Sequence, residues 1–396
     1  MHFAHQRHSR ARPPVPPLRA RLFAQAFRRF GNPFHRGTDS TMNTRTAALT
    51  VLLPLLSVAM ACVSNARLVL GPAAAACSTA GEAVTWWRLP EGDERVRSDR
   101  WCAAVGPPAM LRAAATGPSD GRFVAVSWNV HVGGGDVTAL VNDLRSGALT
   151  GQPERSFVLL LQEVFRAGTV VPRIVPRGAR VARAIRPGGS HRVDITATAR
   201  MLDLSLFYVP SMRNGRPDDS DEDRGNAILS TLPLDDCTAI ELPLERQRRV
   251  AVAASVRRGS ADGAWSLRLV STHFTNTVGH HLWLLSEPAR TRQARALAAV
   301  LDDRPMVLGG DLNTWFGYQD AAYKELARRF DARPPDDRRA TFSVMRLDHV
   351  LPRLPGGWRV TIRRGPGKYG SDHYPVVAEI APASSGAPRA SHPPSR

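Results

Sequence analysis

Between about residue 121 and residue 381, short apolar segments of strand length follow one another with few helices between them. They are rich in β-branched and aromatic residues, and Gly, Pro, Asp or Asn bounds each one. The predicted strands cover residues 122–128, 156–161, 204–209, 226–231, 250–257, 265–272, 305–309, 347–351 and 374–380. Helical spacing of apolar residues is confined to 136–146, 288–301 and 319–329. Because the strands from 204 to 272 succeed one another without a helix, the pattern excludes a purely parallel, doubly wound sheet and predicts a mixed α/β sandwich.

The segments on either side of this region differ in composition. Residues 1–41 are rich in Arg, Pro and His and predict a disordered leader, while residues 382–396, rich in Ala, Pro and Ser, predict a disordered tail. Met42 begins a short basic region and an apolar stretch that together predict a signal peptide over 42–66, so Met42 is a candidate for the true start. Ala59-Met60-Ala61-Cys62 resembles a lipoprotein box, which makes Cys62 a candidate for lipidation and leaves simple cleavage as the alternative.

Length and charge add bounds to this organisation. A chain of 396 residues could hold two or three domains, but the segments above leave one large domain over 119–381 and an N-terminal extension over 67–118. The net charge is +18. Residues 1–41 carry +7 of it, from eight Arg and one Asp, and only two of the chain's basic residues are lysines. The arginine excess is therefore a weak indication of a polyanionic partner.

Cysteine usage is consistent with export. Of the four cysteines, Cys77 and Cys102 enclose a short tryptophan-containing segment and could form a disulfide in an oxidising compartment. Cys237 is predicted to be a lone thiol. The spacing of the four does not suit a structural zinc site.

Polar residues lie at the ends of six of the apolar strands, and the last set directly precedes its strand. They are Asn129, Gln162-Glu163, His273, Asp311 with Asn313, Asp348-His349 and Asp372-His373. One such residue is ordinarily a turn former, but strand ends are where α/β enzymes place catalytic groups. Six of them in one chain therefore predict an active site.

These motifs, in this order, resemble the endonuclease/exonuclease/phosphatase superfamily. The matching pieces are Ser-Trp-Asn (127–129), Leu-Gln-Glu (161–163), Arg-Gly-Asn-Ala-Ile-Leu-Ser (224–230), Ser-Thr-His (271–273), Gly-Gly-Asp-Leu-Asn (309–313), Arg-Leu-Asp-His-Val (346–350) and Gly-Ser-Asp-His-Tyr-Pro (370–375). The resemblance implies a four-layer α-β-β-α sandwich with two mixed β-sheets packed face to face. It also implies a phosphoester hydrolase.

The resemblance carries residue roles with it. It implies that Glu163 is the principal metal ligand, that Asp348 orients His373, and that Asp311 and Asn313 position the scissile phosphate and its nucleophile. It assigns His273 to a phosphate oxygen or the leaving group, and in some relatives this histidine pairs with a glutamate. Glu222 and Asp223 are candidates for that partner by proximity alone.

The residue types themselves suit this chemistry. Glu163, with Asn129 and Asp372, offers the oxygen ligands that Mg²⁺ or Mn²⁺ prefers. His373 titrates near neutrality and is the best candidate for the general base. It needs a carboxylate on its other nitrogen, and Asp372 is nearer in sequence than Asp348.

Shared machinery does not select the substrate. We expect an exported, monomeric phosphodiester hydrolase, with a nuclease slightly favoured, possible membrane association through a lipid anchor, and a sphingomyelinase, phospholipase C-like enzyme or inositol-phosphate phosphatase as alternatives. A catalytically inactive anion-binding module is the alternative of another class. An arginine-lined groove beside His373 would indicate nucleic acid, whereas an apolar rim, for which residues 281–285 are candidates, would indicate lipid.

Overall fold

The computed structural model describes residues 67–72, 77, 84–113, 122–188, 192–258, 265–276 and 286–381. The predicted leader, the signal peptide with Cys62, the apolar segment 281–285 and the tail all lie outside these ranges. None of the helices in the described ranges is long and apolar enough to cross a membrane.

Two mixed sheets of seven strands each form the centre of the molecule. The first sheet has the order β1 (Val69–Leu70), β2 (Thr85–Arg88), β8 (Asp235–Glu241), β9 (Val250–Arg258), β10 (Trp265–His273), β11 (Met306–Asp311) and β12 (Asp348–Arg353). The second has the order β13 (Arg359–Arg364), β14 (Val376–Ala381), β4 (Phe123–Asn129), β5 (Phe157–Ala167), β7 (Glu222–Ser230), β6 (Ser205–Arg213) and β3 (Ala109–Leu111). Each sheet combines antiparallel pairs with at least one parallel pair: β2–β8 and β10–β11 are parallel in the first sheet, and β4–β5 is parallel in the second.

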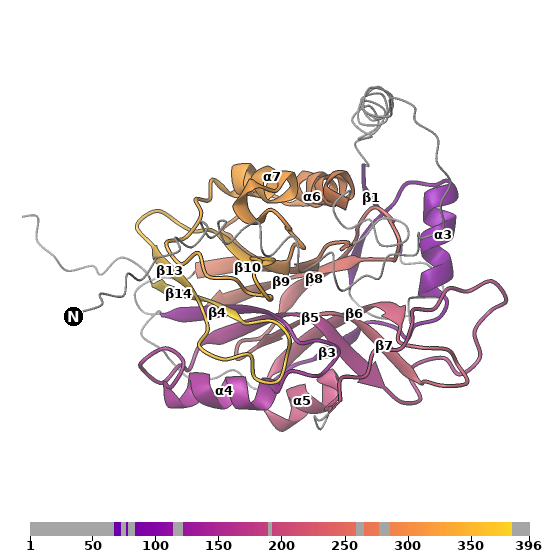
Figure 1. The fold of residues 1–396 in the computed structure, drawn as a ribbon, viewed down its shortest axis with the longest axis horizontal. Coiled ribbons are helices and arrows are strands. Elements are labelled where there is room, and N and C mark those ends of the chain that lie inside the picture. The colour runs from indigo at the N-terminus through magenta and orange to yellow at the C-terminus, as the bar shows by residue number, and fades with distance from the viewer. Residues whose placement is uncertain are drawn as a thin grey trace, which may run out of the picture. The chain divides into compact units, whose positions relative to one another are not determined.

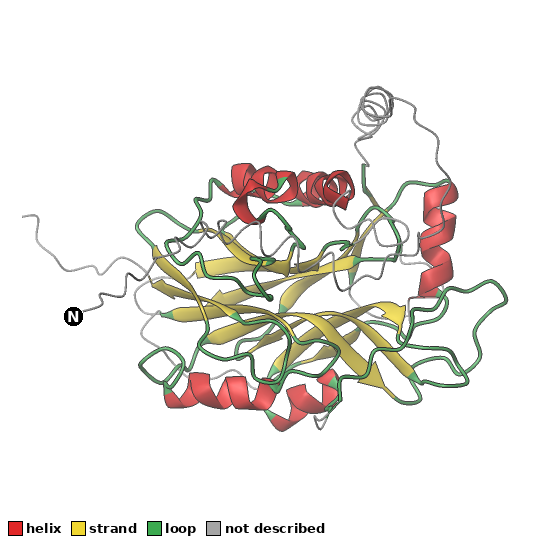
Figure 2. Ribbon diagram, in the orientation of Figure 1, coloured by secondary structure: helices red, strands yellow, loops and turns green. Residues whose placement is uncertain are grey.

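Helices cover the outer faces of the two sheets (Figures 1 and 2). Helices α6 (Glu287–Val300) and α7 (Ala321–Phe330) lie on the first sheet, and α4 (Val137–Ser146) and α5 (Ile195–Met201) lie on the second. Helix α3 (Asp93–Cys102) lies at one end of the sandwich, and the 3₁₀ turn η3 (Gly317–Gln319) precedes α7. The predicted four-layer α-β-β-α sandwich is confirmed.

Both faces of the central strands are buried, which explains their composition. The β4 residues alternate between the two sides of their sheet: Phe123 and Ala125 pack in the core between the sheets, while Val124 and Val126 pack beneath the helices. A strand covered on both faces reads as a continuous apolar run and loses the alternation of a half-exposed strand. The polar residues that end such runs therefore stand out in the sequence.

The N-terminal extension is built into both sheets. β2 pairs in parallel with β8 in the first sheet, and β3 pairs with β6 at an edge of the second sheet. A disulfide joins Cys77 to Cys102, whose Cα atoms are 5.5 Å apart. The region predicted as 67–118 therefore supplies outer strands to the catalytic domain.

The two sheets come closest near the start of the Gly-Gly-Asp-Leu-Asn motif. A Cβ added to Gly309 on β11 would lie 2.7 Å from the Ser127 Cβ and 2.8 Å from the Leu160 Cδ1, both on the facing sheet. These separations are far below van der Waals contact, so only glycine allows this spacing. Gly309 therefore fixes the distance between the strands that carry the polar residues.

We expect Gly309→Ala to lower the free energy of unfolding by about 1–3 kcal/mol, because an overpacked core must shift backbone or rotamers. Chemical denaturation monitored by circular dichroism measures the change. Gly356→Ala is the matched control, since a Cβ at Gly356 meets no atom within 4 Å. Equal stabilities for the two variants would contradict the close approach of the sheets.

Candidate active site

The polar residues predicted from strand ends lie at one end of the sandwich. Asn129 ends β4, His273 ends β10 and Asp311 ends β11, while Asp348 begins the antiparallel β12. His273 is in register with Asp311, and Asp311 with Asp348. Backbone pairing alone therefore places these three side chains in adjacent positions.

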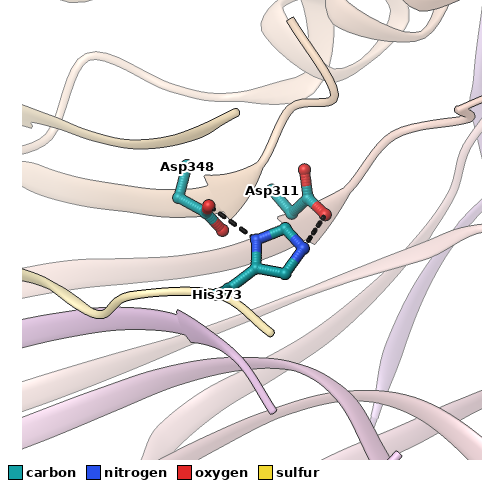
Figure 3. Close-up of side chains that lie close together, drawn as sticks. All are labelled: Asp311, Asp348 and His373. Atoms are coloured by element: carbon teal, nitrogen blue, oxygen red, sulfur yellow. Dashed lines mark hydrogen bonds and ion pairs between the residues drawn. The ribbon is translucent and has the colours of Figure 1, made fainter. Parts of the chain in front are cut away.

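Asp348 and His373 form a buried hydrogen-bonded pair (Figure 3). The Asp348 Oδ2 lies 2.7 Å from the His373 Nδ1, whereas the neighbouring Asp372 reaches only 3.9 Å from the Nε2. Burial opposes the charge on His373, but Asp348, Asp311 and Asp372 together raise its pKa to about 10. Of the two carboxylates that the sequence left open, Asp348 is the one that orients the ring.

Local hydrogen bonds fix the His373 backbone. The indole of Trp128 donates to the His373 carbonyl at 3.1 Å, and the His373 amide donates to the Ser371 hydroxyl at 3.1 Å. Ser371 in turn donates to the carbonyl of Asn129 at 2.7 Å. The end of β4 and the segment that precedes β14 are thus joined, and the imidazole is held in place.

Asp311 lies between two imidazoles. Its Oδ2 is 3.4 Å from the His273 Nε2 and 3.9 Å from the His373 Nε2, and it accepts from the Asn129 Nδ2 at 3.0 Å. Burial, followed by the nearby Asp348 carboxylate, raises the Asp311 pKa to about 7. Burial and the neighbouring carboxylate therefore both disfavour the charged form of Asp311.

Asn313 does not share a strand face with Asp311. β11 ends at Asp311, and Asn313 has a left-handed backbone with φ of 50°. Its backbone amide donates to the Asp311 Oδ1 at 3.0 Å, and its side-chain amide donates to the Phe274 carbonyl at 3.0 Å. Asn313 thus buttresses Asp311 through a tight turn.

A β-bulge presents Glu163. The register of β5 against β7 shifts between Leu161 and Val164, and Glu163 has φ of 53°. A bulge re-aims the side chains at its position, and the Glu163 carboxylate comes within 3.8 Å of the His273 Nδ1. The preceding Gln162 is buried and donates to the Ser271 hydroxyl at 3.0 Å, which ties β5 to β10 across the two sheets.

The partner of His273 is an arginine. The Arg249 Nη1 lies 3.1 Å from the His273 Nδ1, and because guanidinium groups only donate, this nitrogen must accept. The Nε2 then carries the proton and points at Asp311. Burial and the nearby Arg249 charge hold the pKa of His273 well below its usual range, so the ring is neutral and acts as a hydrogen-bond donor.

Neither carboxylate proposed from sequence proximity pairs with His273. Glu222 accepts from Arg192 and Asn214. Asp223 is fully buried and accepts from Arg166 and Tyr208. Both residues lie in β7, which begins at Glu222 and therefore earlier than the predicted strand over 226–231.

Asp372 is half-exposed and faces two imidazoles. Its Oδ1 lies 3.8 Å from the His131 Nδ1 and 3.9 Å from the His373 Nε2, and this oxygen has no hydrogen-bond partner within the described ranges. His131 is a residue that sequence reasoning missed, because it follows the Asn129 motif by two positions and does not end a strand. Its left-handed φ of 49° marks the turn that brings it back toward Asp372.

The remaining sequence candidates are structural. His349 is buried between aromatic rings, and its Nε2 lies 2.7 Å from the Thr314 hydroxyl. Cys237 is a buried free thiol. Gly135 packs so closely on Trp128 that a Cβ there would lie 2.6 Å from the indole.

The donor set fits a hard divalent cation. Glu163, Asp311, Asp372 and Asn129 offer oxygen atoms alone, which is the set that Mg²⁺ and Mn²⁺ prefer. The unpartnered Asp372 Oδ1 is the kind of buried acceptor that a cation would satisfy. Ligand atoms of Asp311, Asp348 and His373 also lie within 4.8 Å of one another, but the hydrogen bond between the last two occupies one atom of each.

Comparison with known proteins identifies the family. The family model described as the endonuclease/exonuclease/phosphatase family matches residues 126–373. The chain belongs to this family. Its members are phosphoester hydrolases, and the predicted resemblance is thereby confirmed. No curated protein matches the chain.

Solved structures of the family are similar to the chain at low identity. An endonuclease/exonuclease/phosphatase from Beutenbergia cavernae is 19% identical over 66% of this chain and 72% of that one, with a TM-score of 0.47. The human Nocturnin catalytic domain with bound sulfate is 15% identical over 69% and 96%, with a TM-score of 0.44. Sphingomyelinase C from Streptomyces griseocarneus is 18% identical over 65% and 99%, with a TM-score of 0.37. None of these likenesses indicates the substrate.

We expect the stability of the protein in EDTA to fall as pH rises from about 6.5 to about 10. The pKa of His373 is raised to about 10 in the folded chain, and an unfolded histidine titrates near 6.5. The paired, protonated ring therefore contributes stability that is fully present below pH 6.5 and is lost as pH rises through the folded pKa.

Urea denaturation across this pH range measures the effect in the wild type and in His373→Gln, which cannot be protonated. The slope should be shallower in the variant. Parallel stability curves for the two proteins would contradict the charged Asp348–His373 pair.

Proposed function

We propose that the protein is a divalent-metal-dependent phosphodiester hydrolase in which water attacks phosphorus and His373 is the general base. The observation that carries the proposal is the buried His373 ring, bonded to Asp348 at 2.7 Å on one nitrogen and open toward Asp311 on the other (Figure 3). An imidazole with one nitrogen fixed by a carboxylate presents the other to a reacting proton.

Each neighbouring side chain has a role in this reaction. Asp348 fixes the His373 tautomer and stabilises the ring when it is charged. Asp311, held by the amides of Asn129 and Asn313, orients the water. The His273 Nε2–H donates a hydrogen bond to a phosphate oxygen. Because the ring is neutral, it stabilises the phosphate through this hydrogen bond and does not transfer the proton.

The residues that would hold the metal are Glu163, Asp372 and Asn129, with Asp311 alongside. A bound divalent cation supplies positive charge that neutralises phosphate oxygens and offsets the carboxylates around His373. Without that offset, Asp311 and Asp372 favour the protonated ring, which cannot accept a proton. The metal is Mg²⁺ or Mn²⁺ on the chemistry of the donors.

A nucleic acid is the substrate that the surroundings of the site favour. Arg224 and Arg249 are both more than nine-tenths buried, and both interact electrostatically with Glu163. Guanidinium groups at such a depth suit phosphate oxygens, which they bind in a planar fork. The alternatives are a hydrolase that acts on lipids, a hydrolase that acts on soluble phosphoesters, and an inactive anion-binding module. The experiments below distinguish a nuclease from each of them.

We also propose that the protein acts outside the cytoplasm, with or without a lipid on Cys62. The signal-like sequence after Met42 and the disulfide between Cys77 and Cys102 support this, because stable disulfides are typical of oxidising compartments. Metabolic labelling with a fatty acid, compared between the wild type and Cys62→Ser, distinguishes lipidation from simple cleavage.

A substrate panel tests the activity. The purified protein with Mg²⁺ or Mn²⁺ should hydrolyse bis-p-nitrophenyl phosphate and plasmid DNA or RNA more efficiently than sphingomyelin, and EDTA should abolish turnover. Failure with all four substrates would refute the enzyme. Sphingomyelin as the preferred substrate would replace the nuclease assignment with a phospholipase C-like phosphodiesterase.

His373→Ala and Asp348→Asn should each lower kcat by about 10²–10⁴-fold, the usual worth of a positioned general base. Asp331→Asn is the control, since Asp331 is an exposed residue with a left-handed φ of 47° that Asn also adopts. Circular dichroism verifies the fold of each variant. If His373→Ala retains turnover, His373 is not the general base. That result would not affect the membership of the chain in the family.

Glu163→Gln should weaken Mg²⁺ binding, because the amide keeps the shape of the side chain and removes its charge. We expect at least a roughly 10- to 100-fold higher metal concentration at half-maximal activity, because the loss of even an outer-shell partner of a metal ligand typically costs that much. Titration calorimetry measures the affinity directly, and the exposed Glu91→Gln is the matched control. Unchanged affinity would place the metal away from Glu163.

A further inference from the structure

A cavity of about 190 Å³ lies beside the catalytic cluster and crosses from one sheet to the other. Glu163 and His273 form the wall that it shares with the cluster. Asp311, Asp348 and His373 do not line it. The His273 ring separates the two spaces, since its Nδ1 faces Arg249 and its Nε2 faces Asp311.

Two bulges shape this cavity. The β5 bulge after Leu161 and the β6 bulge after Pro210 both lie against Gly225 of β7. A Cβ at Gly225 would lie 2.1 Å from the carbonyl oxygen of Val209, so glycine alone permits the β6 chain to pass. The bulges direct Glu163 and Ser211 to the cavity, while Arg224 enters it from the strand between them.

The charge of the lining is positive. Arg224, Arg246 and Arg249 line the cavity against the single carboxylate of Glu163, and His273 is neutral. Burial lowers the pKa of Arg224, and burial with the adjacent Arg224 charge lowers that of Arg249 to about 10. The folded protein thus keeps the guanidinium groups of Arg224 and Arg249 close together, although burial removes the water that would stabilise their charges.

Other buried arginines in the described ranges meet an acceptor: Arg213, Arg268 and Arg346 donate to backbone carbonyls, and several others meet a carboxylate. Arg166 is paired with Asp223, Arg248 with Glu241 and Arg290 with Asp320, each at 2.7 Å or less. In contrast, no ion pair between described residues involves Arg224 or Arg249, and the Arg224 Nη1 is buried with no hydrogen-bond partner in those ranges. A buried, unpaired guanidinium is costly unless something else satisfies it.

We infer that this cavity binds a second phosphate group of the substrate, next to the one that is hydrolysed, with Arg224 as its principal ligand. The inference rests on the proposed function and narrows the substrate to a phosphodiester that carries an additional phosphate nearby. A volume of about 190 Å³ suits such a compact group, because sites for larger ligands are typically about 300–1,000 Å³. A nucleic acid strand presents such phosphates at every linkage, and we take it as the source.

The test compares diesters that differ only in a neighbouring phosphate. The thymidine dinucleotide TpT lacks one, pTpT and TpTp carry it on either side, and bis-p-nitrophenyl phosphate has no second phosphate at all. In the wild type, kcat/KM for pTpT or TpTp should exceed that for TpT by roughly 10- to 100-fold, the range expected for a hydrogen bond to a charged group. Inositol 1,4-bisphosphate is a soluble compound that also carries two phosphate groups, so it tests a source other than a nucleic acid strand. Hydrolysis of this compound in preference to pTpT and TpTp would overturn the assignment to a strand.

Arg224→Gln should remove that advantage and leave the ratio of TpT to bis-p-nitrophenyl phosphate unchanged. Arg224→Lys keeps the charge and should retain part of the advantage, which also provides a readout if the glutamine variant does not fold. Arg328→Gln is the control, since its side chain is 71% exposed on α7. An equal loss on all substrates in Arg224→Gln, or no advantage in the wild type, would overturn the inference while the hydrolase stands.

Phosphate binding separates the inference from the activity. In EDTA, inorganic phosphate should raise the Tm of the wild type and of Arg328→Gln, and should not raise that of Arg224→Gln. If the wild type hydrolyses none of the substrates, the proposed function fails and this shift alone decides the inference. An identical shift in the wild type and Arg224→Gln would show that the cavity is not the phosphate site.

Discussion

The catalytic cluster depends on contact between the two sheets. Its residues come from both of them, so their distances are set by how the sheets pack against each other. Gly309 removes the Cβ that would hold β11 away from Ser127 and Leu160. Gln162 and Ser271 then join β5 to β10 by a buried hydrogen bond, and Ser271 donates to the Leu161 carbonyl at 2.9 Å. Because the interior is close-packed, a shift at this contact would move Glu163 relative to Asp311.

Sequence reasoning recovered the fold and the site because both have strong local signals. Strands that are buried on both faces read as apolar runs, and the residues ending them read as polar exceptions. The strands that it missed lack this signal: β13 (Arg359–Arg364) is a largely exposed edge strand with three arginines, and β8 (Asp235–Glu241) begins with two aspartates. The position of Asn313 could not be predicted, because the chain turns there at φ of 50° and the residue spacing does not reveal the turn.

The arginines mark the limit of a single sequence. A chain with 53 basic residues, nearly all arginine, gives no reason to single out Arg249, and it marks Arg224 only as the first residue of a motif that matches the family. Arg224 and Arg249 differ from most arginines of the chain because they are buried. They differ from the buried Arg248 and Arg290 because, among the described residues, they have no ion pair with a carboxylate. Such a pairing pattern arises from tertiary contacts between β6, β7, β9 and β10, which no local spacing encodes. The same contacts give His273 an arginine partner where the family resemblance suggested a glutamate.

The parallel pairing of β2 with β8 has a consequence for the order of assembly. Thr85 pairs with Thr238, so an early strand must wait for a late one before that part of the first sheet can close. Such non-local pairing slows folding, since loop-closure entropy is lost before the contacts form. During that interval the apolar Trp86 and Trp87 have no strand partner in β8, and the outer side of β8 is an open edge of the kind that pairs with other chains. Expression and refolding yields of this protein should therefore depend on protein concentration more than its final stability does.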